Sequence, residues 1–283
     1  MNPRILPVLL ATALLVGASP ARAHLSLVGG FRPVASEQSA RALWVNPASI
    51  GISGQGTAAA DVLFSGDDAA ALLQSASDEE WDLPTDIRGF SLAAATDRVA
   101  YGFQRELDDL TGVPDWTLSV GNGVQLGAGG RVGMTAEWRG GDDPGFDANA
   151  ALQFPLGREL AVAAVLHDIL AADVDGAETK RTWQVGAAVP FRTMLGTFTW
   201  DAVLVHSRPT VHWFGFSIDG SRYAHLSVFR NTESDWAASF ALAFPNYLFG
   251  IGGVDRDGGA RPDQGHLSAD WSGRQYRGMG GSR

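Results

Sequence analysis

A histidine and a serine stand two positions apart in the stretch Arg222-Tyr-Ala-His-Leu-Ser-Val-Phe-Arg230. Successive residues of a β-strand point to opposite faces, so His225 and Ser227 would share one face of a strand. A histidine within hydrogen-bond reach of a serine can take its hydroxyl proton and make the oxygen a nucleophile. Hydrolysis of an acyl bond is therefore one chemistry that these residue types and this spacing allow.

Seven ionisable residues are a second set of candidates, because each falls on the polar face of a stretch with strand-like alternation. They are Asp61, Arg131, Glu137, Arg139, Asp147, Asp201 and Asp270. Carboxylates and guanidinium groups that face one another form strong, charge-assisted hydrogen bonds. We expect an internal ion-pair network in which Arg41, which precedes the strands, pairs with one of the aspartates. Direct contact with a solute that passes through the protein is the alternative role.

The histidines do not form a metal-binding pattern. His167, His206, His212 and His225 fall on different predicted strands or at different strand ends, and no His-x-x-x-His spacing joins them. Cysteine, the other common zinc ligand, does not occur in the chain. Glycine pairs such as Gly121/Gly123 are not followed by a predicted helix, so they do not resemble a nucleotide-binding loop. We expect no metal and no cofactor.

The elements that would position these residues follow an export signal. Arg4 is followed by an apolar run over 5–17 and by Ala21-Arg22-Ala23, which has the small-x-small pattern of a cleavage site. The apolar run is too short to span a membrane as a helix. We therefore predict a signal peptide over residues 1–23, removed on export.

Charge and composition narrow the class of the exported chain. The net charge is −10, and the signal carries two arginines and no acid, so the mature chain would stand at −12. This balance argues against nucleic acid as a partner, because phosphates require a basic face. Charged residues make up only 18%, glycine numbers 35 and tryptophan 9, and no later run of 18 apolar residues occurs. A secreted β-protein or an outer-membrane barrel fits these values.

From Gly54 onward, stretches of about ten residues alternate between large apolar and small or polar side chains, as barrel strands require. We predict fourteen strands: 56–65, 88–96, 98–105, 114–124, 130–139, 145–154, 159–167, 182–191, 196–206, 210–218, 222–230, 234–244, 246–254 and 264–272. In the fifth, Met134 and Trp138 share the apolar face, and Thr135 and Glu137 share the other. Few lysines or glutamates solubilise the polar faces, which favours a barrel with its apolar side toward lipid over a soluble sandwich.

The predicted connections alternate in length, as in bacterial barrels with short periplasmic turns and longer outer loops. Asp97, 125–129 and 219–221 are among the tight turns, whereas 66–87 and 168–181 are long. Acidic residues are frequent in the long connections, which predicts an acidic, solvated outer rim.

The segment before the strands carries a family resemblance. Ser39-Ala-Arg-Ala-Leu-Trp-Val-Asn-Pro-Ala-Ser-Ile-Gly51 contains an Asn-Pro-Ala turn, in which proline fixes its own φ and keeps the residue before it out of the helical region. This stretch resembles the N-terminal plug of the FadL-type outer-membrane barrels, the group that includes PorV-like proteins. The resemblance implies a plug inside a 14-stranded barrel, with Arg41, Trp44, Asn46, Pro47 and Ala48 as plug residues. A helix of one or two turns is predicted over 36–43.

A barrel weakens the hydrolase reading. Outer-membrane phospholipases and lipid A deacylases have a similar His-x-Ser pair on a barrel strand, but an asparagine follows the serine there and Val228 follows it here. Alternation would also turn His225 and Ser227 toward the lumen, away from a lipid substrate. We therefore do not expect an enzyme.

The sequence as a whole predicts an all-β protein: a signal peptide (1–23), an N-terminal plug segment (24–55), a 14-stranded antiparallel transmembrane barrel (56–272) in the outer membrane and a periplasmic tail (273–283). The resemblance implies passage of small hydrophobic molecules, with outer-membrane lipid as the surroundings. A non-transporting adaptor for a secretion partner protein, as among PorV-like relatives, is the alternative, and a secreted soluble β-protein is a third possibility. The tail lacks the terminal aromatic residue with which outer-membrane barrels commonly end.

Overall fold

The structure is a computed structural model. It describes residues 31–52, 54, 56–68, 86–107, 114–140, 144–157, 159–170, 173–174, 177–178, 181–191, 196–205, 209–221, 224–255 and 263–273. The predicted signal peptide, most of the long connection 66–87 and residues 274–283 of the predicted tail lie outside the described residues.

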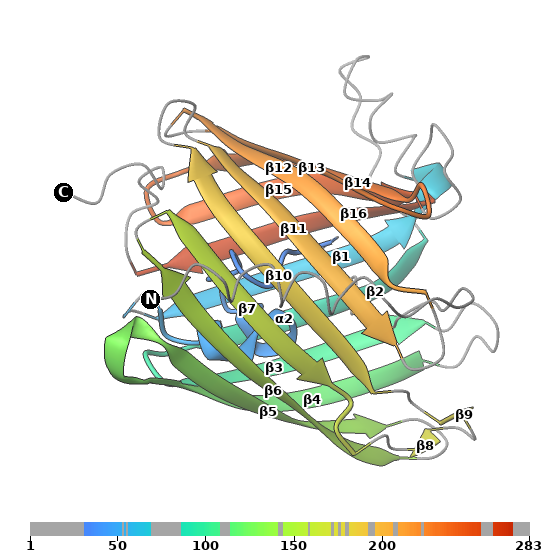
Figure 1. Cartoon of the computed structure of the whole chain (residues 1–283). Helices are drawn as coiled ribbons and strands as arrows, with labels where there is room; N and C mark the ends of the chain where they lie inside the picture. Colours follow the sequence, from blue (N-terminus) through green and yellow to red (C-terminus); the bar gives the residue numbers. More distant parts are fainter. Residues whose placement is uncertain are drawn as a thin grey trace.

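Fourteen antiparallel strands close into a barrel, and β1 pairs with β16 to complete it (Figure 1). The barrel strands are β1 (Thr57–Ser65), β2 (Ile87–Ala95), β3 (Val99–Leu107), β4 (Pro114–Gln125), β5 (Arg131–Gly140), β6 (Gly145–Leu156), β7 (Leu160–His167), β10 (Thr182–Phe191), β11 (Gly196–Val205), β12 (Val211–Ser221), β13 (Ala224–Asn231), β14 (Trp236–Ala243), β15 (Tyr247–Asp255) and β16 (Gln264–Ser272). A separate two-stranded sheet, β8 (Asp173–Val174) with β9 (Ala177–Glu178), lies in the connection between β7 and β10. The predicted all-β, 14-stranded closed antiparallel barrel is confirmed.

The strands form where large apolar residues alternate with small or polar ones. In β5, Met134 and Trp138 are exposed, whereas Thr135 and Glu137 between and beside them are buried. Each barrel strand pairs with the next barrel strand along the chain, with register shifts in the β1–β2 and β12–β13 pairs. In the β5–β6 pair, Met134 stands opposite Ala150 and Glu137 opposite Asp147. Alternation thus sends one set of side chains outward and the other into the barrel.

The connections define two ends of the barrel. At the short-turn end the strands are joined by residues 96–98, 126–130, 157–159, 192–195, 222–223 and 244–246. At the long-loop end they are joined by residues 66–86, 108–113, 141–144, 168–181, 206–210, 232–235 and 256–263. Both β1 and β16 have their outer termini, Thr57 and Ser272, at the short-turn end.

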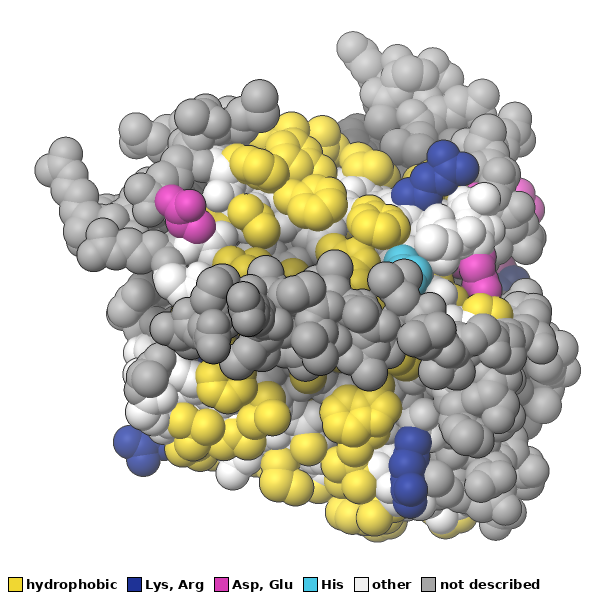
Figure 2. All heavy atoms as spheres, in the orientation of Figure 1, with side chains coloured by type: hydrophobic (Ala, Val, Ile, Leu, Met, Phe, Trp, Pro, Cys, Tyr) yellow, Lys and Arg dark blue, Asp and Glu magenta, His cyan; other side chains and the backbone are white. Residues whose placement is uncertain are grey.

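The outer wall is apolar between these two ends. Figure 2 shows hydrophobic side chains spread over the wall in view, with the charged side chains near its two edges. Among the exposed hydrophobic residues, Met134 is 55% and Trp138 54% exposed. Leu226, Val228 and Phe240 are each more than 40% exposed. A surface of this kind is the side that lipid would cover.

The N-terminal segment 31–52, here called the inner segment, lies inside the barrel and contains α2 (Ala42–Val45) and the 3-10 turn η1 (Pro47–Ser49) (Figure 1). The predicted helix over 36–43 is wrong, because the helix begins only at Ala42. Glu37 accepts the amide hydrogen of Ser39, and the Ser39 hydroxyl accepts that of Arg41, so side chains take amides that a longer helix would use. Among the described residues, no helix has the length and apolar character needed to cross a bilayer.

Candidate functional site

The inner segment crosses the lumen from one end of the barrel to the other. Phe31 packs against Trp213 and Phe229, near the long-loop ends of β12 and β13. Gly51 lies against the backbone of Asp97 in the short turn between β2 and β3, with φ of 75°, which glycine adopts without strain. The inner segment therefore extends through the lumen between the two ends of the barrel. The contacts between Phe31 and Gly51 determine how firmly the segment is held.

Arg41 is the centre of the strongest polar contact. Its Nε donates to Asp61 Oδ2 at 2.6 Å and its Nη2 to Asp61 Oδ1 at 2.7 Å, a bidentate pair. Its Nη1 donates to Asp270 Oδ1. The side chains of Arg41, Asp61 and Asp270 are at most 5% exposed. Burial opposes the charge of the guanidinium, and the two facing carboxylates offset this cost.

The two aspartates belong to the strands that close the barrel. Asp61 lies on β1 and Asp270 on β16, and these are the first and last strands of the sheet. The Ser91 hydroxyl of β2 also donates to Asp61, at 3.1 Å. Arg41 therefore fastens the inner segment to both sides of the closing seam.

The Asn-Pro-Ala turn is fixed on the opposite wall. Asn46 is extended, with φ of −155°, as the residue before a proline prefers, and its side chain accepts the Ala48 amide hydrogen at 3.1 Å. Its Nδ2 donates to Val34 O at 2.7 Å and lies 3.2 Å from Gln153 Oε1 on β6. Pro47 and Ala48 follow as the first residues of η1, which packs on β4, β5 and β6.

Trp44 and its helix are held by neutral hydrogen bonds. The indole Nε1 of Trp44 donates to Ser119 Oγ of β4 at 3.0 Å, and Thr135 Oγ1 of β5 donates to Leu43 O at 2.7 Å. Both hydroxyls are buried. The helix thus has a polar partner on each of two adjacent strands.

Glycines on the facing wall leave room for the inner segment. A Cβ at Gly133 would come within 2.1 Å of the Pro47 carbonyl carbon, and one at Gly123 within 2.6 Å of Ile50 O. These clashes are with backbone atoms, which cannot rotate away. The strands β4 and β5 therefore carry glycine where the backbone of η1 approaches them.

Arg131 and Asp201 also contact the inner segment through its backbone. Arg131 Nε donates to Ala48 O at 2.7 Å and its Nη2 to Ile50 O at 2.5 Å. Asp201 Oδ2 on β11 accepts the Val34 amide hydrogen at 2.9 Å and a hydrogen from Gln184 Nε2 at 3.0 Å. Charged residues on β1, β5, β11 and β16 thus surround the segment.

The other three predicted interior residues, Glu137, Arg139 and Asp147, bond to residues of the barrel wall and not to the inner segment. Arg139 Nη2 donates to Glu137 Oε2 at 2.9 Å and to Asp168 Oδ1 at 2.5 Å. Asn149 Nδ2 donates to Glu137 Oε1 at 2.8 Å. Asp147 Oδ1 accepts the amide hydrogens of Ala148 and Leu170. These contacts link β5 and β6 to the start of the β7–β10 connection, near the long-loop end.

A hydrophobic cluster closes around Phe31. Its ring stacks on Trp213 with centroids 4.3 Å apart and an interplanar angle of 11°, and it meets Phe229 edge-on at 5.1 Å. The other members are buried residues of β11, β12, β14 and β15: Val203, Val211, Ala237 and Val254. The cluster occupies the long-loop half of this part of the lumen.

Below that cluster most inward-facing residues in the middle of β13 to β16 are small. His225 and His266 share this face, and His266 is buried, at 3% exposure. Six of the small residues are half-buried: Ser227, Ser239, Ala241, Gly250, Gly252 and Ser268. By contrast, Asp61, Thr135 and Gln153, which the inner segment touches, are at most 7% exposed. The segment therefore packs more closely against β1 and β4 to β6 than against this stretch.

The His225 and Ser227 pair of the hydrolase reading lies on this stretch. Ser227 Oγ shares a 2.6 Å hydrogen bond with Ser239 Oγ of β14. His206 lies outside the described residues. Within the described ranges, no three His, Asp or Glu side chains are grouped as a metal site would require.

Several contact residues were not among the predicted site residues. Gln153, Ser119, Gln184 and Glu37 are all buried and all bonded to the inner segment or to one of its partners. Alternation placed Gln153 and Gln184 on the inner face, which was the available signal. Phe31 lies seven residues after the predicted start of the mature chain, in a stretch without periodicity, and no sequence pattern marks it.

No protein-family model matches the chain, and no curated protein matches its sequence. Among solved structures, the chain is similar to the KdgM porin, with 7% identity, a TM-score of 0.40, and coverage of 76% of this chain and 98% of that one. A mutant of the Rh. blastica porin gives 9% identity and a TM-score of 0.40, with 77% and 98% covered. Omp33 from Acinetobacter baumannii gives 8% identity and a TM-score of 0.42, with 77% and 97% covered. At these values the likenesses carry no inference about function.

Proposed function

We propose that the chain is an outer-membrane barrel through which small, uncharged and largely apolar molecules cross the membrane, and that the inner segment is the plug of this passage. An apolar outer wall on a closed barrel supports the membrane location, because closure leaves no unpaired strand edge in lipid. The FadL-like Asn-Pro-Ala turn supports the class of solute.

One observation carries the proposal. The inner segment is bonded to ionisable side chains of β1, β5, β11 and β16, whereas the small inward-facing residues of β13 to β16 remain half-buried. Space beside this stretch would be lined mainly by hydroxyls, methyl groups and glycine backbone, with the imidazoles of His225 and His266 on the same face. An apolar solute there would take water from few polar side chains. At its long-loop side the Phe31 cluster would act as the barrier.

Truncating Phe31 tests the proposal. In Phe31→Ala proteoliposomes we expect faster entry of small uncharged solutes than in the wild type, measured as the rate of osmotic swelling. The control is Phe214→Ala on the same strand as Trp213, because Phe214 is exposed on the outer wall. Displacement of an apolar fluorescent ligand by a fatty acid would support the solute class. If neither variant changes the swelling rate and no apolar ligand binds, the passage is refuted.

A non-transporting adaptor for a secretion partner is the second candidate. The bidentate Arg41–Asp61 pair with Asp270 favours it, because a plug held by buried ion pairs is costly to displace. An adaptor would co-purify with a partner protein from membranes, and Phe31→Ala would leave solute entry unchanged.

A further inference from the structure

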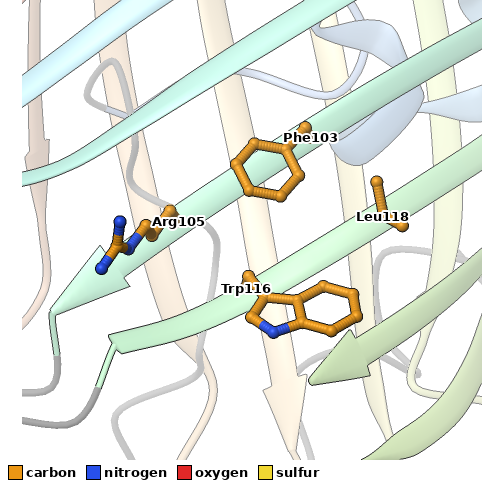
Figure 3. A pocket seen from close by; sticks show the side chains of 4 residues that line it. All are labelled: Phe103, Arg105, Trp116 and Leu118. Carbon is orange, nitrogen blue, oxygen red and sulfur yellow. The ribbon is translucent and has the colours of Figure 1, made fainter. Parts of the chain in front are cut away.

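A shallow cavity of about 430 Å³, open to the outside, lies on the outer wall between β3 and β4. It is lined by Phe103, Arg105, Trp116 and Leu118. Figure 3 shows Phe103 and Arg105 on one strand beside Trp116 and Leu118 on the next. The register pairs Phe103 with Leu118 and Arg105 with Trp116, so two rows of side chains frame the cavity.

The cavity faces away from the lumen. A Cβ at Gly102 would meet the Trp44 and Leu43 side chains, so the inward face of β3 passes through position 102. Positions 103 and 105 therefore point outward, on the same side as Tyr101, which is 57% exposed. Two neighbouring rings extend this apolar surface. The ring centroids of Phe90 and Phe103 are 5.7 Å apart, and those of Trp138 and Trp116 are 6.0 Å apart.

Arg105 places a charge among the apolar side chains of this part of the wall. It is exposed, and within the described part of the chain it makes no ion pair. It stands two positions from Leu107, where β3 ends at the long-loop end. A guanidinium stays charged at any physiological pH, so next to lipid it needs an anionic partner or water.

We propose that this cavity binds a phosphorylated lipid of the outer leaflet, with the phosphate on Arg105 and an acyl chain between Phe103, Trp116 and Leu118. A guanidinium can hold two phosphate oxygens at once, and the aromatic side chains offer apolar area to a methylene chain. The location fits this ligand, because the long-loop end of a bacterial barrel faces the outside and Arg105 lies near that end. The site rests on the membrane location proposed above but not on the passage of solutes.

Native mass spectrometry of the full-length barrel in detergent, titrated with diphosphoryl lipid A, tests the site. Arg105→Gln keeps an unbranched polar side chain with a hydrogen-bond donor, but it removes the charge and shortens the side chain. Its matched control is Arg98→Gln, an exposed arginine in the short turn between β2 and β3, beside Asp97 at 3.9 Å. We expect Arg105→Gln to weaken lipid A binding about tenfold, because a charged hydrogen-bonding partner is lost, and Arg98→Gln to leave it unchanged.

Two further measurements separate the ligand chemistry. Dephosphorylated lipid A should bind wild type and Arg105→Gln equally, and inorganic phosphate alone should not compete at millimolar concentration. Equal lipid A affinity in wild type and Arg105→Gln would overturn the site, and so would full competition by inorganic phosphate. Solute entry should be the same in Arg105→Gln as in wild type, so failure of this site and failure of the proposed passage give different results.

Discussion

Replacing Arg41 with methionine tests whether the buried ion pairs hold the inner segment in the barrel. Methionine keeps an unbranched apolar side chain and removes the charge between Asp61 and Asp270. Both carboxylates would then remain buried, at 1% and 5% side-chain exposure, without their cation. Breaking a buried pair by removing one partner costs about 3–5 kcal/mol, and here one cation serves two anions.

The free energy of unfolding can be measured by urea titration of the barrel in lipid vesicles, followed by tryptophan fluorescence. We expect Arg41→Met to lower it by at least about 3 kcal/mol. Adding Asp61→Asn and Asp270→Asn removes the uncompensated charges and should restore more than half of that loss. The control is Arg88→Met, whose partner Asp86 lies 2.8 Å away in a half-exposed pair, with an expected cost under about 1 kcal/mol.

A loss below about 1 kcal/mol for Arg41→Met would refute the reasoning, because it would mean that the ion pairs do not stabilise the folded barrel. A triple variant that is less stable than Arg41→Met would refute the explanation by uncompensated charge. Gel migration before and after boiling in SDS checks that each variant forms a barrel at all.

Two further outcomes follow from the walls of the barrel. Gly133→Ala should lower the free energy of unfolding by about 1–3 kcal/mol and increase solute entry, because its Cβ would overlap the Pro47 carbonyl. The control in the same urea titration is Gly127→Ala, whose added Cβ would have no neighbouring atom within 4 Å. Met134→Arg should cost about 2–4 kcal/mol in vesicles if this outward residue faces lipid, and Met134→Leu should be nearly neutral. Equal stability of the Arg and Leu variants would contradict a lipid-facing wall.

The strands could be predicted because each carries its own signal. In β5, the alternation of Val132, Met134 and Trp138 with small or polar residues placed the strand at 130–139, and the structure has it at Arg131–Gly140. The turn at Asp97 and the strand β16 could likewise be predicted from their own residues. Period-two alternation depends only on neighbouring residues, so it survives without any knowledge of the fold.

The side-chain contacts inside the lumen were harder to predict from the sequence than the strands. Glu137 and Arg139 stand two apart on one strand, and their contact follows from that spacing. The Asn46–Gln153 and Trp44–Ser119 contacts join residues 107 and 75 positions apart, and many polar inner-face residues could have served as well. The helix over 36–43 was wrong because Glu37 and Ser39 bind backbone amides there, a competition that helical propensity does not reveal.

Because Arg41 reaches β1 and β16 together, the order of events in assembly is constrained. These are the first and last barrel strands of the chain, and their pairing brings two acidic side chains to the same side of the sheet. A barrel that closed without the inner segment would enclose the carboxylates of Asp61 and Asp270 without the guanidinium of Arg41. Closure of the sheet and placement of the inner segment are therefore coupled energetically, because a closed barrel without the segment would hold two buried carboxylates without their cation.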